Sequence, residues 1–310
     1  MSIVVVGSVA YDGIKSPSGQ VDRCLGGAAT YFSLAASYFT QVRVVAVVGE
    51  DFTEQDEEVL RTRQVDTTGI EHAAGKSFFW RGEYGENLNE ARTLETQLNV
   101  FQNFNPQVPT QYLDSEFLFL ANIDPVLQGN VRRQMNGRVK LVGGDTMNYW
   151  ITDPNHRKNL LQTLKGVDVL LINDAEAKLI AQESSVPRAA RKVLEMGPRA
   201  LVIKHGEYGA TVFFKEREFG GGSHPFRAPA LPMEEVRDPT GAGDSFAGGF
   251  MGYIASQKSL DREVFKRAMF YGGVMGSFAV ERFGTERLQS LTRKEIDARY
   301  QVFRELTHIE

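Results

Sequence analysis

Asp238-Pro-Thr-Gly-Ala-Gly-Asp244, followed by Ser245-Phe-Ala-Gly-Gly-Phe250, is the stretch from which the rest of this chain is best understood. Gly241, Ala242 and Gly243 are small enough for the backbone to turn sharply and aim several unpaired N–H groups at one point. Apolar residues recur at helical spacing from residue 245 to 256, so the glycines are expected at a helix N-terminus, where the helix dipole favours negative charge. The stretch therefore predicts a site that binds an oxyanion.

Asp244 falls in the first turn of this expected helix, where a carboxylate is stabilised in its ionised form. A carboxylate beside an oxyanion site can accept the proton of a bound hydroxyl, so Asp244 is the candidate general base. Taken alone, the same residues also fit a plain turn in which Asp244 only caps the helix.

Composition places the chain among ordinary globular proteins. Of its 310 residues, 42% are hydrophobic and 24% are charged, which suits one large α/β domain or two modest ones. The formal net charge of −4 gives no general attraction for nucleic acid or an anionic membrane. Cys24 is the only cysteine, and no apolar run approaches the roughly twenty residues that cross a bilayer. We therefore expect small-molecule chemistry in the cytoplasm.

Short apolar runs alternate with helical patterns along most of the chain, which predicts an α/β fold with a doubly wound, mostly parallel sheet flanked by helices. The expected strands are residues 3–9, 42–48, 116–121, 140–144, 167–172, 200–204 and 210–214. The expected helices are residues 28–38, 53–63, 126–135, 156–164, 175–182 and 188–195, with a largely helical remainder to residue 306.

Two segments, residues 13–25 and 75–100, lack this alternation of apolar runs and helical patterns, and we interpret them together as one small β-strand lid. Within the second segment, residues 77–83 and 92–98 predict a hairpin around Gly85 and Asn87. The alternative is a pair of solvated surface loops. The expected organisation is a large nucleotide- and substrate-binding domain of residues 1–12, 26–74 and 101–310, with a lid of residues 13–25 and 75–100.

A second chemical element, Asn173-Asp-Ala-Glu176, directly follows an expected strand. Open α/β sheets bind ligands at the carboxyl ends of their strands. An amide and a carboxylate three residues apart at a helix start can hold the water molecules of a hydrated Mg²⁺ ion, and they can equally well cap the helix. Asn87-Leu-Asn-Glu90 has the same spacing but follows no buried strand, so we interpret it as a surface turn.

Two further groups of polar residues follow strands. Lys204-His-Gly-Glu-Tyr-Gly209 comes after strand 200–204, and its glycines would let the backbone approach a phosphate or a ribose, although an ordinary turn contains the same residues. Asp145 and Asn148 follow strand 140–144, where an active-site role and a helix-capping role are both open.

Together these elements resemble the PfkB, or ribokinase-like, family of carbohydrate and nucleoside kinases. The stretch 238–250 resembles the family's Asp-Thr-x-Gly-Ala-Gly-Asp motif before a Phe-containing helix, with Pro239 as a departure. Asn173 to Glu176 resembles the family's Asn-x-x-Glu motif, and Lys204 to Gly209 its Lys-x-Gly-x-x-Gly segment. The motifs occur in the family's order, and the resemblance covers essentially the whole chain.

At the N-terminus, Asp12 ends the first expected strand, and Gly26-Gly27 precedes the first helix. In the resemblance, Asp12 binds substrate hydroxyls, which suits a carboxylate that can accept two hydrogen bonds. The glycine pair lets the helix start approach the sugar. The family's Gly-Gly-x-x-x-Asn pattern has its Asn where this chain has Thr30 or Tyr31, and Thr30 is our candidate for substrate binding.

The resemblance implies an ATP-dependent kinase that transfers the γ-phosphoryl group to a hydroxyl of a small sugar or sugar-like substrate. Asp244 is then the general base, and the amides of residues 241–243 form the anion hole. Mg²⁺ would be held through water by Glu176 and Asn173, and a monovalent cation, K⁺, by Asp238. The residues expected to bind ATP are Asn173, Lys204, Gly206, Gly209 and Thr240.

Other site patterns fail. Gly69 to Ser77 looks like a P-loop, but five residues separate its glycines where four are required, and Phe-Phe-Trp follows instead of a helix. Gly7 to Gly13 does not supply the Gly-x-Gly-x-x-Gly of a dinucleotide-binding fold. The histidines show no metal-binding spacing; they are at positions 72, 156, 205, 224 and 308.

The acceptor is the open question, because the family phosphorylates sugars, nucleosides, keto-deoxy acids and polyols on one scaffold. An adenosine-type nucleoside kinase or a polyol kinase is therefore an alternative. The aromatic residues Phe78, Phe79, Trp80 and Tyr84 are suited to cover a nucleoside base or to form the core of the lid. An alternative of another class is a non-catalytic sugar- or nucleotide-sensing protein. We expect a monomer, or a homodimer formed through the lid.

Overall fold

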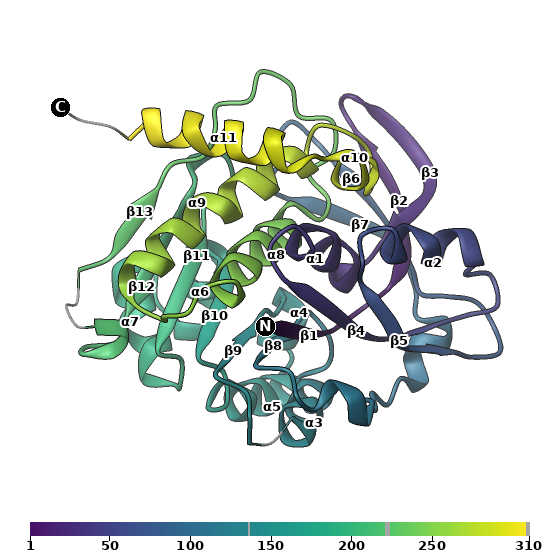
Figure 1. The fold of residues 1–310 in the computed structure, drawn as a ribbon, viewed down its shortest axis with the longest axis horizontal. Helices are drawn as coiled ribbons and strands as arrows, with labels where there is room; N and C mark the ends of the chain where they lie inside the picture. The colour runs from purple at the N-terminus through teal and green to yellow at the C-terminus, as the bar shows by residue number, and fades with distance from the viewer. Residues whose placement is uncertain (136, 221–223, 308–310) are drawn as a thin grey trace.

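The computed structural model describes residues 1–135, 137–220 and 224–307. Within these residues the main sheet has nine strands in the order β13-β12-β11-β10-β9-β8-β1-β4-β5 (Figure 1). All neighbouring strands are parallel except the pairs β11–β12 and β12–β13. The strands are β1 (Ser2–Val6), β4 (Gln41–Val48), β5 (Asp66–His72), β8 (Phe117–Leu120), β9 (Leu141–Gly144), β10 (Val169–Asn173), β11 (Ala200–Lys204), β12 (Ala210–Phe214) and β13 (Phe226–Ala228).

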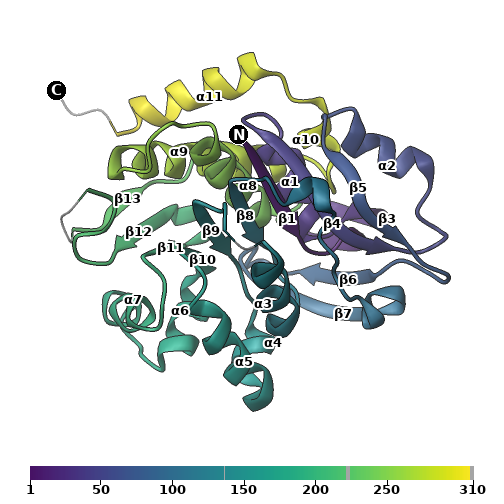
Figure 2. The ribbon, with the colours of Figure 1, turned by 60° about the horizontal axis from the view of Figure 1, so that its bottom comes forward.

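Helices cover both faces of this sheet, so its central strands are buried on both sides, whereas the edge strands β5 and β13 are partly exposed (Figure 2). One layer contains α1 (Ala28–Ala36), α2 (Glu54–Arg61), α8 (Ala242–Ala255), α9 (Arg262–Ala279), α10 (Glu286–Ser290) and α11 (Arg293–Glu305). The other contains α3 (Pro125–Gln134), α4 (Asn148–Thr152), α5 (Pro154–Leu164), α6 (Asp174–Ala181) and α7 (Val186–Glu195). The expected doubly wound α/β fold is confirmed. No helix among the described residues is both long and apolar enough to cross a membrane.

A second, four-stranded sheet has the order β3-β2-β6-β7 and lies on the same side of the molecule as β4 and β5 (Figures 1 and 2). Its strands are β2 (Ala10–Ser16), β3 (Gly19–Gly26), β6 (Phe79–Tyr84) and β7 (Ala91–Gln97). The expected hairpin is confirmed by the antiparallel pairing of β6 with β7. The two irregular segments of the sequence thus pair with each other through β2 and β6.

The structure corrects the expected first strand. β1 ends at Val6, and Ala10 already begins β2 of the smaller sheet, so Asp12 does not stand at the carboxyl end of a main-sheet strand. Apolar residues 3–6 and 9–10 are continuous enough to predict one strand, whereas Gly7 and Ser8 mark the actual break. β5 and the short edge strand β13 were also missed, because neither has a continuous apolar run.

Helices α1 and α8 lie unusually close because glycines of α8 face α1. A Cβ atom at Gly248 would lie 2.4 Å from the carbonyl oxygen of Phe32 and 2.8 Å from Cβ of Ala35. A Cβ atom at Gly252 would lie 2.9 Å from Cα of Ala36. These glycines cost some helix propensity, but they allow close contact between the helices that carry two parts of the candidate site.

We expect Gly248→Ala to lower the free energy of unfolding by about 1–3 kcal/mol, because the methyl group would collide with the α1 backbone. Gly129→Ala in α3 is the matched control, since its Cβ atom would meet only side-chain atoms, at 3.3 Å and beyond. The control should change stability by no more than about 1 kcal/mol. Urea unfolding of both variants measures the difference; equal stabilities would contradict the close contact.

Candidate active site

The N-terminus of α8 is open to a ligand. Gly241 is its N-cap residue and adopts the left-handed conformation, with φ of 72°, and no side chain caps the first turn. A Cβ atom at Gly241 would lie 2.3 Å from the ring of Tyr31, so only glycine fits here. The Ala242 N–H donates to the carbonyl oxygen of Pro239 at 3.2 Å. The first turn, which contains Gly243 and Asp244, therefore carries the helix dipole without a side-chain cap.

Lys204 lies against this helix start. A Cβ atom at Gly243 would be 3.0 Å from Lys204 Nζ, and Nζ is 3.5 Å from Asp145 Oδ2. Burial alone would lower the pKa of Lys204, but the carboxylates of Asp145, Glu176 and Asp244 outweigh burial and raise it. The ammonium group is thus held charged at the junction of β11 with α8.

The carboxylates around Lys204 are harder to ionise than usual. Burial, reinforced by Asp145, raises the pKa of Asp244 to about 8, although Lys204 opposes the shift. Burial and Asp145 likewise raise the pKa of Glu176 to about 7. Burial also raises the pKa of Asp145 itself, against the attraction of Lys204. Three carboxyl groups share one ammonium group, so the site suits a further cation.

Asn173 and Glu176 form a reciprocal cap at the start of α6. Asn173 Oδ1 accepts from the Glu176 N–H at 2.8 Å, and Glu176 Oε2 accepts from the Asn173 N–H at 2.8 Å. Helix capping, one of the two roles expected for Asn173 and Glu176, is therefore present in the structure. These bonds use one oxygen of each side chain, so Glu176 Oε1 and Asn173 Nδ2 are not committed to the cap.

Asp12 reaches the start of α1 from β2. Its Oδ2 atom accepts from the Gly27 N–H at 3.4 Å, and a Cβ atom at Gly26 would lie 1.9 Å from that oxygen. Gly27 has φ of 92°, and a Cβ atom there would meet the carbonyl oxygen of Ser8 at 2.4 Å. Burial raises the pKa of Asp12 to about 7, the Gly27 N–H lowers it, and Asp238 raises it further. Both glycines are needed for this approach.

Thr30 and Tyr31 are both buried in α1, and neither the Thr30 Oγ1 atom nor the Tyr31 hydroxyl has a hydrogen-bond partner among the residues that the structure describes. Thr30 is fully buried, whereas the Tyr31 ring packs against Gly241 at the anion-binding turn. Of the two candidates for the family's Asn position, Tyr31 is thus the one that contacts the candidate phosphoryl site.

Asp238 and Thr240 lie in the loop that leads into α8. The fully buried Asp238 carboxylate accepts from the N–H groups of Thr240 and Gly284, each at 2.8 Å. Burial raises its pKa even though both bonds oppose the shift. Gly209 has φ of 92°, and a Cβ atom there would lie 2.2 Å from the carbonyl oxygen of Ala228, so the structure explains this glycine by chain packing.

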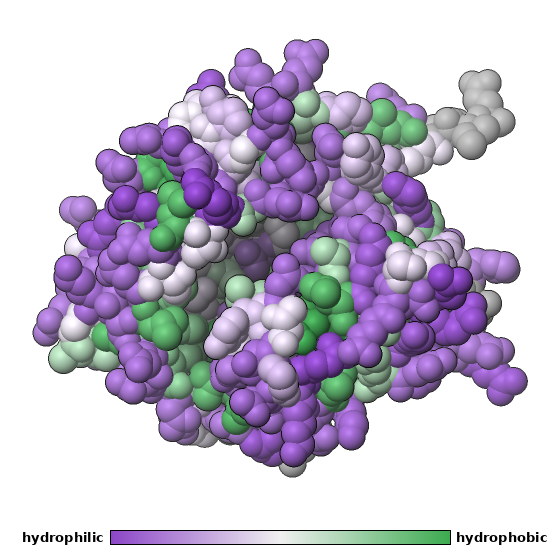
Figure 3. Space-filling model, turned by 180° about the vertical axis from the view of Figure 1, so that it is seen from behind, coloured by the Kyte–Doolittle hydropathy of each residue, from purple (hydrophilic) through white to green (hydrophobic). Residues whose placement is uncertain are grey.

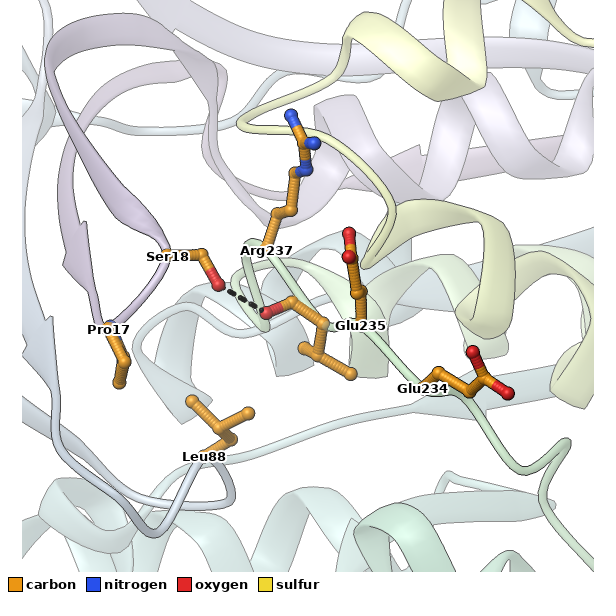
Figure 4. Close-up of a pocket in the computed structure, with 7 residues that line it drawn as sticks. Pro17, Ser18, Leu88, Glu234, Glu235 and Arg237 are labelled. Carbon is orange, nitrogen blue, oxygen red and sulfur yellow. Dashed lines mark hydrogen bonds between the residues drawn. The ribbon is translucent and has the colours of Figure 1, made fainter.

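The small sheet closes onto the same loop through contacts that sequence reasoning missed. Thr240 Oγ1 donates to the Tyr84 hydroxyl at 3.1 Å, and Ser16 Oγ donates to the carbonyl oxygen of Arg237 at 2.6 Å. Ser18 Oγ donates to the carbonyl oxygen of Val236 at 3.0 Å, beside an open cavity of about 540 Å³ (Figure 4). These partners are 156, 221 and 218 positions apart, so no local pattern could reveal them.

Gly206 meets the loop between β6 and β7. A Cβ atom at Gly206 would lie 1.7 Å from Asn89 Oδ1, and Gly206 has φ of 58°. The surface-turn interpretation of residues 87–90 is therefore incomplete, since this turn contacts the segment expected to bind nucleotide. The molecule is hollowed near the centre of the face opposite the view of Figure 1 (Figure 3).

The structure thus gathers Asp145, Glu176, Lys204 and Asp244 into one charged cluster. Asp12 lies close enough to raise the pKa of Asp244, and Asp238 in turn lies close enough to raise the pKa of Asp12. Asn148 begins α4 and is exposed, so the structure gives no support for placing it in this cluster. Asp145 is the active-site candidate that the sequence left open between catalysis and capping, and its contact with Lys204 supports the first.

Comparison with known proteins extends over nearly the whole chain. A family model described as pfkB family carbohydrate kinase matches residues 2–291. The cytidine kinase of Thermococcus kodakarensis is 30% identical over 267 residues, which cover 84% of this chain and 91% of that protein.

Two solved structures share the fold. The nucleoside kinase of Burkholderia thailandensis in complex with inosine has a TM-score of 0.73 at 20% identity and covers 97% of this chain and 98% of its own. A double mutant of the fructokinase from Vibrio cholerae O395, with fructose, ADP and potassium ion bound, has a TM-score of 0.77 at 16% identity and covers 96% of this chain and 97% of its own. Together with the match of the family model, these similarities show that the chain belongs to the pfkB family of carbohydrate kinases and is a phosphotransferase with a hydroxyl acceptor.

Proposed function

We propose that this enzyme transfers the γ-phosphoryl group of ATP to a hydroxyl of a neutral sugar-like acceptor, at the N-terminus of α8. The observation that carries the proposal is the position of Asp244 in an uncapped first turn, with Lys204 against Gly243. A base, a helix dipole and an ammonium group are thereby combined at one point. Asp244 can accept the proton of the acceptor hydroxyl, and the helix dipole and the Lys204 ammonium group can stabilise negative charge on the phosphoryl oxygens.

In the proposed reaction, Asp244 accepts the proton of the acceptor hydroxyl as that oxygen forms its bond to the γ-phosphorus. The bond from the γ-phosphorus to the bridging oxygen breaks, and ADP leaves with that electron pair. The N–H groups of the first α8 turn and the Lys204 ammonium stabilise charge on the transferring oxygens. Since the transition state of such a transfer is loose, positioning and electrostatics are expected to contribute most of the rate.

We propose Glu176 and Asn173 as the residues that hold Mg²⁺ through water. The fit rests on the cluster of buried carboxyl groups with raised pKa, which carries fewer positive than negative groups. Among residues 1–135, 137–220 and 224–307, no group of three His, Cys, Asp or Glu side chains is arranged to hold a metal directly, so contacts through water suit the site better. When bound, Mg²⁺ neutralises triphosphate charge.

The other candidate site residues are assigned to the acceptor, to a monovalent cation or to the nucleotide. Asp12, with Gly26 and Gly27, is proposed to bind acceptor hydroxyls. Asp238 is proposed to serve a monovalent cation, because its carboxylate is fully buried and accepts its hydrogen bonds from uncharged groups of Thr240 and Gly284. We propose that Gly206 and Thr240 approach the nucleotide. Gly209 and Thr30 are retained as weaker candidates, since packing already accounts for the first and full burial separates the second from solvent.

We propose that residues 13–25 and 75–100, which make up most of the small sheet, act as a lid over the acceptor. Its contacts with residues 236–240 would couple closure to the loop that leads into the anion site. The exposed edge strand β7 offers a surface for a homodimer through the lid, and a monomer is the alternative. We place the enzyme in the cytoplasm, where ATP and a reduced Cys24 are expected.

Asp244→Asn should lower kcat by about 10²-fold or more, because the amide keeps the shape of the side chain but cannot accept the proton. The Kd for MgATP should change by only a few-fold. Steady-state kinetics and calorimetric titration measure the two quantities. Near-normal turnover with intact nucleotide binding would remove Asp244 from the role of base.

The activity should depend on pH through the same side chain. Since the pKa of Asp244 is raised to about 8, its carboxyl is mostly protonated below that pH and cannot act as base. With both substrates well below KM, kcat/KM should rise nearly tenfold per pH unit below about pH 7, less steeply through pH 8, and then level off. The Asp244→Asn variant should lose this rise. A wild-type profile that is flat from pH 6 to pH 9 would contradict the raised pKa.

Glu176→Gln should increase the Mg²⁺ concentration needed for half-maximal rate about tenfold or more, the scale typical of groups that orient bound metal. The KM for the acceptor should change little. Asp174→Asn is the matched control, because Asp174 lies in the same helical turn but pairs with Lys178. Metal titrations of the three proteins provide the measurement; indistinguishable curves for Glu176→Gln and the control would argue that Glu176 only caps α6.

A further inference from the structure

One face of the small sheet is directed at the candidate acceptor site. Side chains alternate along β2 and β6, and the parallel register pairs Asp12 with Trp80 and Ile14 with Gly82. Tyr84, two residues further along β6, belongs to the same face and meets Thr240 in the loop before α8. Trp80 therefore lies beside Asp12 on the face of the sheet that is turned toward the phosphoryl-transfer site.

The Trp80 indole is held flat against the sheet. A Cβ atom at Gly82 would lie 2.0 Å from Cη2 and 2.3 Å from Cζ2 of Trp80, so the six-membered ring occupies the space that a side chain at position 82 would fill. Trp80 Nε1 donates to Thr93 Oγ1 at 3.1 Å, which fixes the other end of the indole. The ring is thus positioned from both ends before any ligand binds.

The outer surface of this indole is available for a ligand. Trp80 is only half-buried and Thr93 is exposed, so large-domain atoms do not fully cover this part of the sheet. In the part of the chain that the structure describes, the close aromatic pairs and cation–π contacts do not include Trp80. A preorganised and uncovered aromatic surface is typical of a stacking platform for a heteroaromatic ring.

The charges next to this platform disfavour an anionic acceptor. The charged groups that influence Asp12 and Tyr84 are aspartate carboxylates rather than cations. Lys15 and Arg81 alternate onto the other face of the sheet, where they pair with Glu83 and Glu95. A sugar phosphate or a sugar acid would find no cation on the acceptor-facing side of β2 and β6, whereas a neutral ring with hydroxyl groups suits it.

We propose that Trp80 is the residue that selects a nucleoside as the acceptor, by stacking on its base while Asp12 binds the ribose hydroxyls. This inference rests on the proposed function and deepens it, because it names the substrate class of the same site. Base stacking on an aromatic side chain contributes about 1–3 kcal/mol, which corresponds to about 5- to 150-fold in affinity.

The kinetic test uses Gly82→Ala, which is expected to displace the indole without removing it. Gly85→Ala is its matched control, since a Cβ atom at Gly85 has no atom within 4 Å. We expect Gly82→Ala and Trp80→Ala to raise the KM for cytidine, adenosine or inosine at least fivefold with little change in kcat. Trp80→Phe should restore most of the affinity, and Gly85→Ala should behave as wild type.

The binding test does not need catalysis. Trp80 and Trp150 are the only tryptophans, so in a Trp150→Phe protein the fluorescence reports Trp80 alone. Nucleosides should quench this emission with saturation, and ribose or fructose should not. Asp12→Asn should weaken nucleoside binding but leave the quench at saturation unchanged, because the base still reaches the indole.

The outcomes separate this inference from the proposed function. If nucleosides quench Trp80 but no acceptor is phosphorylated, the stacking platform stands and the proposed reaction fails. If a bare sugar or a sugar acid is phosphorylated with at least the kcat/KM of any nucleoside, and nucleosides do not quench Trp80, the kinase assignment stands and the platform is overturned. Equal KM effects of Gly82→Ala and Gly85→Ala would also overturn it.

Discussion

The balance of charge around Lys204 is the constraint on which the site depends. One ammonium group lies against the first turn of α8 and 3.5 Å from Asp145, while Glu176 and Asp244 add further carboxyl groups to the same region. Burying so many acids is unfavourable unless positive charge compensates them. The helix dipole and Lys204 provide part of this compensation, and in the proposed function a cation that accompanies the nucleotide would provide the remainder. The buried acidity that is unfavourable for the folded chain thus suits the site to the cation-bound nucleotide of the proposed reaction.

The sequence predicted the main sheet well because buried parallel strands are continuous apolar runs, as in β4 and β10. It did not predict β5, because residues Asp66–His72 contain no apolar run and the strand is defined by its pairing with β4. It also merged β1 with β2, because the change of sheet after Val6 is a tertiary event that local periodicity does not encode. The sequence therefore predicted which segments are strands where both faces of the strand are buried. It did not predict to which of the two sheets a strand belongs.

The candidate site follows the same division. The Gly-Ala-Gly-Asp turn and the Asn173–Glu176 cap were predictable, because each depends on residues adjacent in sequence. The partnership of Asp145 with Lys204 and the contact of Tyr84 with Thr240 were not, since each joins distant segments. Trp80 was visible only as one aromatic residue among several. Its orientation depends on Gly82, which leaves space for the ring, and on Thr93, which accepts a hydrogen bond from the indole N–H.

The glycine contact between α1 and α8 has a consequence for the timing of the reaction. The start of α1 is hydrogen-bonded to Asp12, and the start of α8 carries Asp244, so in the proposed reaction these two helices would define the separation between the acceptor oxygen and the phosphorus it attacks. Gly248 and Gly252 leave no room for side chains between the two helix backbones. The separation would therefore be set when the chain folds and would not have to be established again in each catalytic cycle. Much of the entropic cost of bringing two substrates together is then met in the folded scaffold. In the proposed reaction the lid would then serve to exclude water and to hold the acceptor at a distance that the two helices have already set.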